Sequence, residues 1–466
     1  EPPIGKESLY ATQFKNLPIG QMEEKFADYG EVQIKQLNDR SKMYYTPNKE
    51  NNVFQLVVQY GAGEREFPKL GYAAQLMNNA GIMGAYEPQE LKEELSKLNA
   101  TCHVTADDDN LYIIMEGYEA TLPQACQLLS RQILMPKLDE KQLARLEGSA
   151  MGMRQQRKDN VSILNEALRQ YMLYGEKSDY IKELTDKEIY ELQISELTGD
   201  INRASNYEAK VFFTGTLPFD QVYDILSKNL PLVANERPSN SPQAKDMMPV
   251  TENTVYFLPN NDAEQAQIHL YIPMQKADKK DDVLRSAFNQ YFGLDFTGIV
   301  LNEIREKRSM AYTAYAFVGT QGIAGKASYL RGYIGTQNDK ANDALDVLMG
   351  LVNDMPKNPE RIDNIKSYLR QAMLTSHPSF RNKAMELVDL GYRGYTDDPA
   401  KENLPKVDAL TFDDIVKFYE ENIKDKPYCI SIMGNPKNID LKRLEKFGKV
   451  VKLNERKLFN TKDALF

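Results

Sequence analysis

The sequence contains one run of elements twice, once near the middle of the chain and once near its end. KVFFTGTLPFDQVYDIL begins at Lys210, and YCISIMGNPKNIDLKRL begins at Tyr428. Each reads as a strand, a turn with glycine, a proline and a helix, and roughly 215 residues separate the two. A period this long indicates duplicated domains rather than a solenoid of short repeats. We therefore expect two units of one design.

A polar segment separates the two expected units. Residues 235–245 read NERPSNSPQAK, with prolines and no apolar periodicity. Because domain boundaries fall in such stretches, we place a linker at 235–248. The first domain is then 1–234 and the second 249–466, and each is long enough to bury a core of its own.

Strand and helix patterns follow the same order in both units. The expected strands of the first unit are 31–45, 52–60, 101–105, 111–116 and 210–215. Those of the second unit are 254–258, 267–273, 311–320, 326–336 and 428–433. The longest helical regions are expected at 122–205 and 341–419. Tight turns between neighbouring strands imply antiparallel pairs. The predicted fold class is therefore α+β: two duplicated domains, each an antiparallel-rich sheet with helices packed on one face.

Composition and charge exclude several classes of partner. The formal net charge is -9, whereas nucleic acids and anionic membrane surfaces both select basic surfaces. No segment reaches the roughly 18 consecutive apolar residues of a membrane span. The opening residues, EPPIGKESLY, show no initiator methionine and no apolar signal core, and they read as a linker, which favours a chain cut from a longer polypeptide. The compartment of a soluble protein stays open between cytoplasm and periplasm.

The residue types that usually carry hydrolytic chemistry are scattered along the chain. The histidines are His103, His269 and His377, and the cysteines are Cys102, Cys126 and Cys429. No histidine shares a predicted helix with a second ligand three or four residues away, the spacing that metal motifs use. The adjacent Cys102 and His103 point to opposite faces of a strand, and no G-x-S-x-G elbow is present. We therefore expect neither a catalytic metal nor a nucleophile in this chain.

One segment joins an amphipathic helix to a strand. It runs from Tyr291 to Ala316 and reads YFGLDFTGIVLNEIREKRSMAYTAYA. Its apolar row of Phe296, Val300 and Ile304 predicts a helix that docks on a sheet. The polar end of this helix is basic, which suits a helix C-terminus.

That basic end brings two functional groups together. It carries Arg305, Lys307 and Arg308, and the expected strand then starts at Ala311. Arg305 and Tyr312 thus lie at a junction where both can reach one ligand, and a cation with a phenol suits a carbonyl or a developing oxyanion. On the residues alone, a basic helix end beside a half-buried tyrosine is the more ordinary interpretation.

The same segment resembles the signature L-R-E-K-x-x-x-A-Y in the second half of the inverzincin zinc metallopeptidases, the family of pitrilysin, insulysin and the mitochondrial processing peptidase. The match reads IREKRSMAY, and the resemblance covers essentially the whole chain. Those enzymes have four α+β domains, arranged as two halves hinged into a clamshell around a chamber. The resemblance implies that this chain is one half, and that Arg305 and Tyr312 assist at the scissile carbonyl. The glycine-rich helix start of the family is reduced here to Gly293 and Gly298, so this chain departs from the family pattern at that point.

The resemblance also places a metal motif on the first helix. In the family's catalytic half, H-x-x-E-H supplies two zinc ligands and the general base, and a glutamate roughly 75 residues later is the third ligand. The matching helix, LGYAAQLMNNAG, puts Tyr72, Gln75 and Leu76 at those positions, and Gly152 falls at the third ligand. All four positions are degenerate. The resemblance thus implies no metal or other cofactor in this chain, with zinc in a partner catalytic half.

A second match concerns substrate binding. Asn99 and Ala100 match an N-A pair that opens the edge strand in the family's catalytic half. There an extended peptide adds to the sheet as a further strand. The resemblance implies that Asn99 and Ala100 contribute to substrate binding.

The sequence therefore predicts an inactive half of a clamshell zinc metallopeptidase, with no activity of its own. Its expected partner is a catalytic half, in the same polypeptide or as a homologous subunit. Together they would enclose a chamber, exclude large folded proteins by size and cleave peptides. Two alternatives stay open. One is the non-catalytic subunit of a heterodimeric processing peptidase; the other is a structural or peptide-binding module, like the core proteins of a respiratory complex that share this fold.

Overall fold

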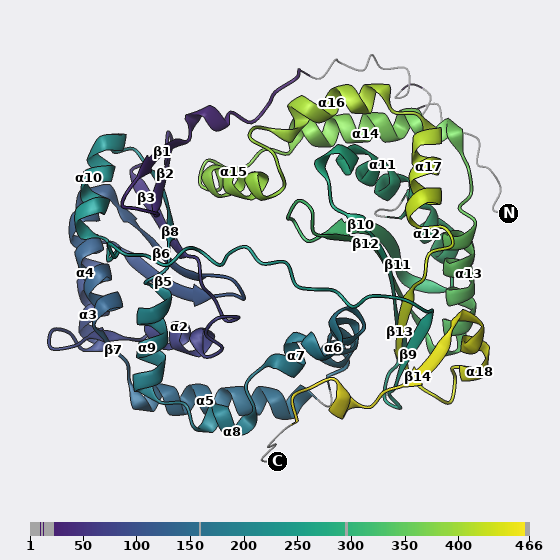
Figure 1. Ribbon diagram of the computed structural model, residues 1–466, viewed down its shortest axis with the longest axis horizontal. Coiled ribbons are helices and arrows are strands. Elements are labelled where there is room, and N and C mark those ends of the chain that lie inside the picture. Colours follow the sequence, from purple (N-terminus) through teal and green to yellow (C-terminus); the bar gives the residue numbers. More distant parts are fainter. Residues whose placement is uncertain (1–9, 11–12, 14–22, 158–159, 294–296, 462–466) are drawn as a thin grey trace.

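The structure is a computed structural model, and it describes residues 10, 13, 23–157, 160–293 and 297–461. Within these residues the chain forms two six-stranded sheets, each covered by helices, and a short two-stranded ribbon. The two sheets lie on opposite sides of the molecule, and helices and a long connecting segment run between them (Figure 1).

The first sheet has the order β1-β2-β8-β3-β6-β5. Its strands are β1 (Gln33–Gln36), β2 (Lys42–Pro47), β3 (Val53–Tyr60), β5 (Thr101–Ala106), β6 (Leu111–Tyr118) and β8 (Ala209–Gly215). The pair β2–β8 is parallel, and the other pairs are antiparallel. The hairpin β5–β6 closes at 107–110, where the Asp107 side chain accepts hydrogen bonds from the backbone N–H groups of Asp109 and Asn110.

The second sheet has the order β11-β12-β10-β13-β9-β14. Its strands are β9 (Thr254–Pro259), β10 (Gln265–Lys276), β11 (Ala311–Thr320), β12 (Ala327–Gln337), β13 (Cys429–Gly434) and β14 (Lys449–Lys452). The strand β9 pairs in parallel with β13 and β14, and the remaining pairs are antiparallel.

The duplication predicted from the sequence appears in the order of the strands. Five strands of each sheet match: β2, β8, β3, β6 and β5 in the first, and β9, β13, β10, β12 and β11 in the second. In both sheets, neighbouring strands are the first, last, second, fourth and third of these five along the chain. The sixth strand breaks the repeat, because β1 precedes its unit and runs antiparallel to β2, whereas β14 follows its unit and runs parallel to β9. The fold is thus α+β with two duplicated units.

Each unit buries its own helices against the outer face of its sheet. In the first unit these are α2 (Leu70–Met77), α4 (Leu122–Leu134), α9 (Ile194–Ala204) and α10 (Phe219–Asn229), with α3 (Pro88–Lys97) beside them. In the second they are α11 (Asp282–Phe292), α13 (Ala341–Asn353), α14 (Ile362–Thr375), α16 (Pro399–Ala409) and α17 (Phe412–Asn422). α17 begins at a capping box, in which Thr411 and Asp414 bond each other's backbone N–H groups.

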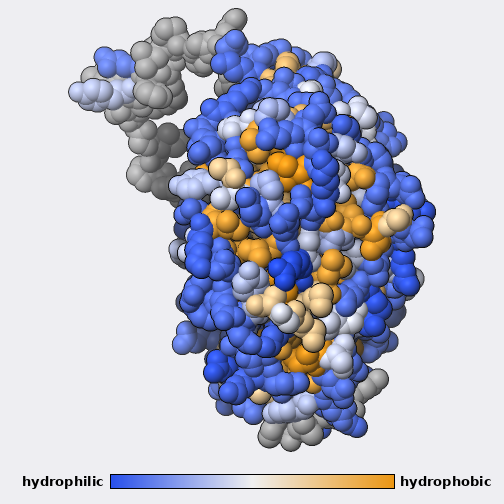
Figure 2. All heavy atoms as spheres, turned by 90° about the vertical axis from the view of Figure 1, so that its left-hand side faces the viewer, coloured by the Kyte–Doolittle hydropathy of each residue, from blue (hydrophilic) through white to orange (hydrophobic). Residues whose placement is uncertain are grey.

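The outer face of the first unit is mostly hydrophilic, with apolar side chains in patches between the polar ones (Figure 2). α10 explains the pattern, because Val222 and Leu226 are buried while charged residues on its other face meet water. Part of the exposed apolar surface comes from the ribbon of β4 (Gly81–Ile82) and β7 (Pro136–Lys137), where Met83 and Met135 are more than half exposed.

The inner face of each sheet is covered by a helix from the other unit. The helix α6 (Val161–Tyr174) packs Leu164 and Leu168 against Leu258 and Met433 of the second sheet. The helix α15 (Lys383–Tyr392) lies on the first sheet (Figure 1), where Ala384 packs in a cluster with Val57 and Phe212. Each unit's own helices thus lie on one face of its sheet, as predicted. The opposite face of each sheet is covered by a helix from the other unit, α15 on the first sheet and α6 on the second.

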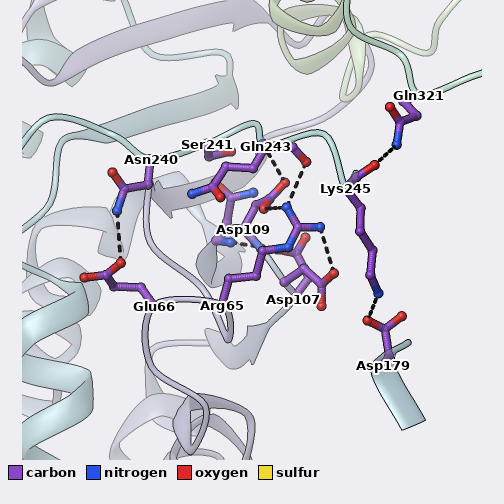
Figure 3. Close-up of polar contacts among 12 residues, drawn as sticks. Arg65, Glu66, Asp107, Asp109, Asp179, Asn240, Ser241, Gln243, Lys245 and Gln321 are labelled. Atoms are coloured by element: carbon purple, nitrogen blue, oxygen red, sulfur yellow. Dashed lines mark hydrogen bonds and ion pairs between the residues drawn. The ribbon is translucent and has the colours of Figure 1, made fainter. Parts of the chain in front are cut away.

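The segment 235–248 has no helix or strand and is fastened along its length. Asn240 donates from its backbone N–H to the Gly61 carbonyl at 2.8 Å, and Arg65 donates to the Gln243 carbonyl at 2.8 Å. Gln321, at the end of β11, donates to the Lys245 carbonyl at 2.5 Å (Figure 3). The segment therefore carries hydrogen bonds from both units.

No helix in the described part of the chain is long and apolar enough to cross a membrane. Cys126 and Cys429 are buried, and burial raises the pKa of their thiols to about 12 and about 11. Both thiols stay protonated near neutral pH, and neither is a nucleophile there. His269 is buried beside Asn165, whose Oδ1 lies 3.1 Å from its Nε2, and burial lowers its pKa to about 3.

Candidate functional site

Arg305 lies in the connection between a short helix and the strand β11. The short helix α12 (Ile299–Leu301) continues as a π-helical turn, Asn302–Glu306. Val300 and Ile304 are fully buried against the second sheet, as their spacing predicts. Phe296, the first member of the predicted apolar row, lies outside the described residues. Arg305 lies within this π-helical turn, and turns of this kind are rare and frequent at functional sites.

The turn closes into β11 through Ser309. This residue has a left-handed backbone (φ 48°), and its N–H donates to the Arg305 carbonyl at 2.8 Å. The next N–H, of Met310, donates to the Ile304 carbonyl at 3.0 Å. A non-glycine residue in this region is uncommon, and it fixes the position at which the chain reverses.

Tyr312 sits on a β-bulge. Ala311 pairs with Thr336 and Thr313 pairs with Gly335, so Tyr312 has no partner position on β12. Bulges re-aim one side chain away from its sheet. Tyr312 is 77 % exposed, whereas its neighbour Ala311 is buried. The expectation of a half-buried tyrosine is therefore wrong, and the bulge is the reason.

Arg305 and Tyr312 contact each other. The guanidinium Cζ lies 5.2 Å from the centroid of the Tyr312 ring, within the range of a cation–π pair. Glu303 engages both Lys307 and Arg308, with its carboxylate 2.6 Å from the Lys307 ammonium. Arg305 instead has its Nε 3.5 Å from Glu306, and its side chain is 35 % exposed. The basic end thus divides into two cations that share one carboxylate and one arginine that leans over the tyrosine.

The pair lines an open cavity of about 460 Å³ at the end of the second sheet. The same cavity is lined by Gln265, Thr336 and Lys340. A guanidinium supplies several fixed donors and a phenol supplies one, so the wall can donate hydrogen bonds to a carbonyl oxygen or a carboxylate.

The four degenerate metal positions lie in the first unit. Tyr72, Gln75 and Leu76 are on α2, and Gly152 is on α5 (Glu140–Gln156). Leu76 is 4 % exposed and belongs to the core, and Gln75 points to solvent. Burial raises the pKa of Tyr72, which keeps its phenol neutral. An aliphatic side chain, an amide, a neutral phenol and a glycine do not form a zinc site, so these residues do not fit the metal.

Among the described residues, no group of three or more His, Cys, Asp or Glu side chains is arranged to hold a metal ion. Beside Tyr72 the structure has an ionic cluster instead. Arg154 lies 2.7 Å from Asp186 and 3.5 Å from Glu183, and Arg157 also pairs with Glu183. These pairs fasten α5 to the segment that follows α6.

Asn99 and Ala100 lie where α3 leads into β5. Asn99 has a left-handed backbone (φ 49°), and Ala100 is buried with its N–H bonded to the Leu95 carbonyl at 2.9 Å. Both line a groove of about 520 Å³ that follows β5, with Leu91 and Tyr118 among its walls. The strand β5 is the last of its sheet.

The structure brings only some of the predicted site residues together. Arg305 and Tyr312 share one cavity, in the second unit. Asn99 and Ala100 share another, in the first unit, and none of the four degenerate metal positions lines either cavity. In Figure 1, α2 and β11 lie on opposite sides of the molecule.

One carboxyl group escaped the sequence analysis. Glu64 lines a third cavity, of about 680 Å³, between the segment 64–68 that precedes α2, the helix α7 (Asp179–Lys182) and the segment 235–248. Burial and the nearby carboxylates of Asp108, Asp107 and Asp179 raise its pKa to about 7. No sequence signal marks it, because Glu64 belongs to no motif and the carboxylates that face it lie far away in sequence.

Part of the chain matches a known family of protein domains. Residues 205–369 match the model of the peptidase M16 inactive domain, and this range contains IREKRSMAY. No curated protein matches the chain. A solved peptidase M16 inactive domain from Pseudomonas fluorescens is similar to this chain in fold, with a TM-score of 0.67 at 17 % identity, over 88 % of this chain and 99 % of that one.

Two longer proteases have the same fold in one part of their length. The ferredoxin protease FusC, solved in complex with Arabidopsis ferredoxin, has a TM-score of 0.67 at 12 % identity, over 91 % of this chain and 49 % of FusC. The periplasmic protease PqqL from Escherichia coli has a TM-score of 0.64 at 12 % identity, over 91 % of this chain and 50 % of PqqL. This chain spans about half the length of each. Residues 205–369 thus match the inactive-domain model of the M16 peptidases, and the chain as a whole has the fold of a solved inactive domain of that kind.

Proposed function

We propose that this chain is the non-catalytic half of a clamshell zinc metallopeptidase. It closes a chamber with a separate catalytic half, excludes large folded proteins by size and helps to bind the peptide. The observation that carries the proposal is the corner formed by Arg305 and Tyr312, which the bulge and the π-helical turn hold toward an open cavity. The four positions that do not fit zinc support a catalytic metal in the partner half.

The corner acts through donated hydrogen bonds. The guanidinium of Arg305 offers charge-assisted donors in a fixed fork, and the phenol of Tyr312 adds one hydroxyl donor. Both interactions strengthen as negative charge develops on the scissile carbonyl oxygen, so they favour the transition state over the bound peptide. Because their contact holds the two side chains together, they need little rearrangement when substrate arrives.

The test uses this chain together with the catalytic half and a short peptide substrate. We expect Arg305→Ala and Tyr312→Phe each to lower kcat/KM by about 10²–10³-fold, the usual effect of removing one oxyanion donor. Matched controls are Arg308→Ala, whose arginine pairs with Glu303 on the same turn, and Tyr368→Phe, whose ring is exposed on α14. Both controls should stay within about twofold of the parent.

The result that contradicts the proposal is equally specific. Unchanged kcat/KM in Arg305→Ala and Tyr312→Phe would remove the assisting role of the corner. If adding the chain leaves the catalytic half's activity unchanged while the chain still binds extended peptides, a peptide-binding module explains the protein better.

A further inference from the structure

At one edge of each sheet lies a strand that has no further strand beside it among the described residues. These strands are β5 in the first sheet and β11 in the second. Such an edge exposes a row of N–H and C=O groups, and a peptide or another protein can pair with that row. Whether the outward N–H and C=O groups of each edge strand are free or already bonded therefore decides whether an extended segment can bind there.

In the first unit a side-chain amide occupies the edge. Asn78, directly after α2, donates from Nδ2 to the Val104 carbonyl at 2.9 Å. Its Oδ1 accepts from the Val104 N–H at 2.8 Å. Both main-chain groups that Val104 turns outward are thus bonded.

The second unit repeats this contact with different residues. Asn289, on α11, donates from Nδ2 to the Val318 carbonyl at 3.0 Å, and its Oδ1 accepts from the Val318 N–H at 2.6 Å. The strands β5 and β11 hold equivalent places in the two sheets, and α2 and α11 follow equivalent strands along the chain. The contact thus recurs at equivalent places in both duplicated units, which marks it as a feature of the fold rather than an incidental contact.

A carboxamide is chemically one peptide unit, with a donor and an acceptor side by side. In an antiparallel ladder, a hydrogen-bonded residue exchanges both of its main-chain bonds with one partner residue. Asn78 and Asn289 therefore supply what the nearest residue of an added strand would supply. In β11 the next outward group is closed as well, because the Ala316 N–H donates to the Gly293 carbonyl at 3.0 Å.

We propose that Asn78 and Asn289 are edge plugs: each takes the place of one residue of an added strand and closes its sheet to extended peptides at Val104 and Val318. An extended peptide that enters the groove along β5 at Asn99 meets this plug at Val104. The inference does not depend on a peptidase role, because it concerns main-chain pairing at the two edges.

The test removes each amide from the full-length chain. In Asn78→Leu the side chain keeps a similar volume but cannot bond Val104, and Asn289→Leu does the same at Val318. The matched control is Asn79→Leu, since Asn79 follows Asn78 in sequence and bonds Lys92 at 2.9 Å instead. Hydrogen–deuterium exchange then follows the Val104 and Val318 amides, and a labelled peptide with the sequence of β6, LYIIMEGY, serves as the added strand.

We expect each variant to speed exchange at its own edge amide by about tenfold, with β3 and β6 unchanged. Each variant should also bind the β6 peptide at least about tenfold more tightly than the parent, whereas Asn79→Leu should match the parent. If one variant fails to fold, the other variant still tests the proposal at its own edge. Parent-like exchange and parent-like peptide binding in a folded variant would overturn the proposal, and so would exchange that rises across the whole sheet without any gain in peptide binding.

Discussion

The carboxyl group of Glu64 lies in surroundings that disfavour its charge. Its pKa is raised to about 7 from an ordinary value of 4.5, first by burial and then by the carboxylates of Asp108, Asp107 and Asp179. The folded chain therefore holds a proton on Glu64 at pH values at which the unfolded chain has released it. Stability contributed by this proton is complete below about pH 4.5 and is lost as the pH rises to about 7.

The raised pKa of Glu64 predicts the effect of Glu64→Gln on stability. The variant should match the parent in unfolding free energy at pH 4.5 and exceed it by about 2 kcal/mol at pH 8, after allowance for partial exposure of the group. Urea unfolding at the two pH values measures the difference. Glu50→Gln, at an exposed position, should stay within about 0.5 kcal/mol of the parent at both. A pH-independent effect of Glu64→Gln would show that its carboxyl is ordinary.

At the residue scale, the sequence predicted the identity of the corner residues better than their setting. Spacing placed Arg305 and Tyr312 at one junction, and the structure has them in contact. The exposure of Tyr312 could not be foreseen, because a bulge depends on the register between β11 and β12. The plugging role of Asn78 was equally hidden, since its partner Val104 lies 26 residues away in sequence.

At the scale of elements, the exchanged helices are the feature that sequence patterns missed. Periodicity predicted a helical region at 122–205, and α6 lies within it. An apolar stripe shows that a helix face is buried, but it does not name the sheet that buries it. α6 lies within the first unit along the chain but packs on the second sheet, so only the three-dimensional structure assigns its partner.

The packing of α6 predicts the cost of truncating it. Leu168 is fully buried between the helix and the second sheet. Leu168→Ala should lower the free energy of unfolding by about 2–5 kcal/mol, through lost burial and the cavity left behind. Ser162→Ala, on the exposed side of the same helix, should change it by less than about 0.5 kcal/mol. Chemical denaturation followed by circular dichroism measures both, and a cost below about 1 kcal/mol for Leu168→Ala would mean that α6 is loosely docked.

At the scale of the whole molecule, the two units depend on each other. Each gives one helix to the other, and the segment 235–248 is bonded to both. We expect fragments 1–234 and 249–466 to be poorly folded when produced separately, because each then exposes the apolar inner face of its sheet. Produced together, they should form a folded one-to-one complex. Size-exclusion chromatography and thermal unfolding distinguish the two cases, and cooperative unfolding of either fragment alone would contradict this dependence.

The exchange of helices also sets an order in time. During synthesis the first sheet has all its strands once β8 has emerged, yet α15, the cover of its inner face, lies some 170 residues further on. At about 5–20 residues per second, that interval lasts roughly 10–30 s. Val57 and Phe212 stay uncovered throughout it, so the nascent first unit presents an apolar sheet face to its surroundings until the second unit is largely made.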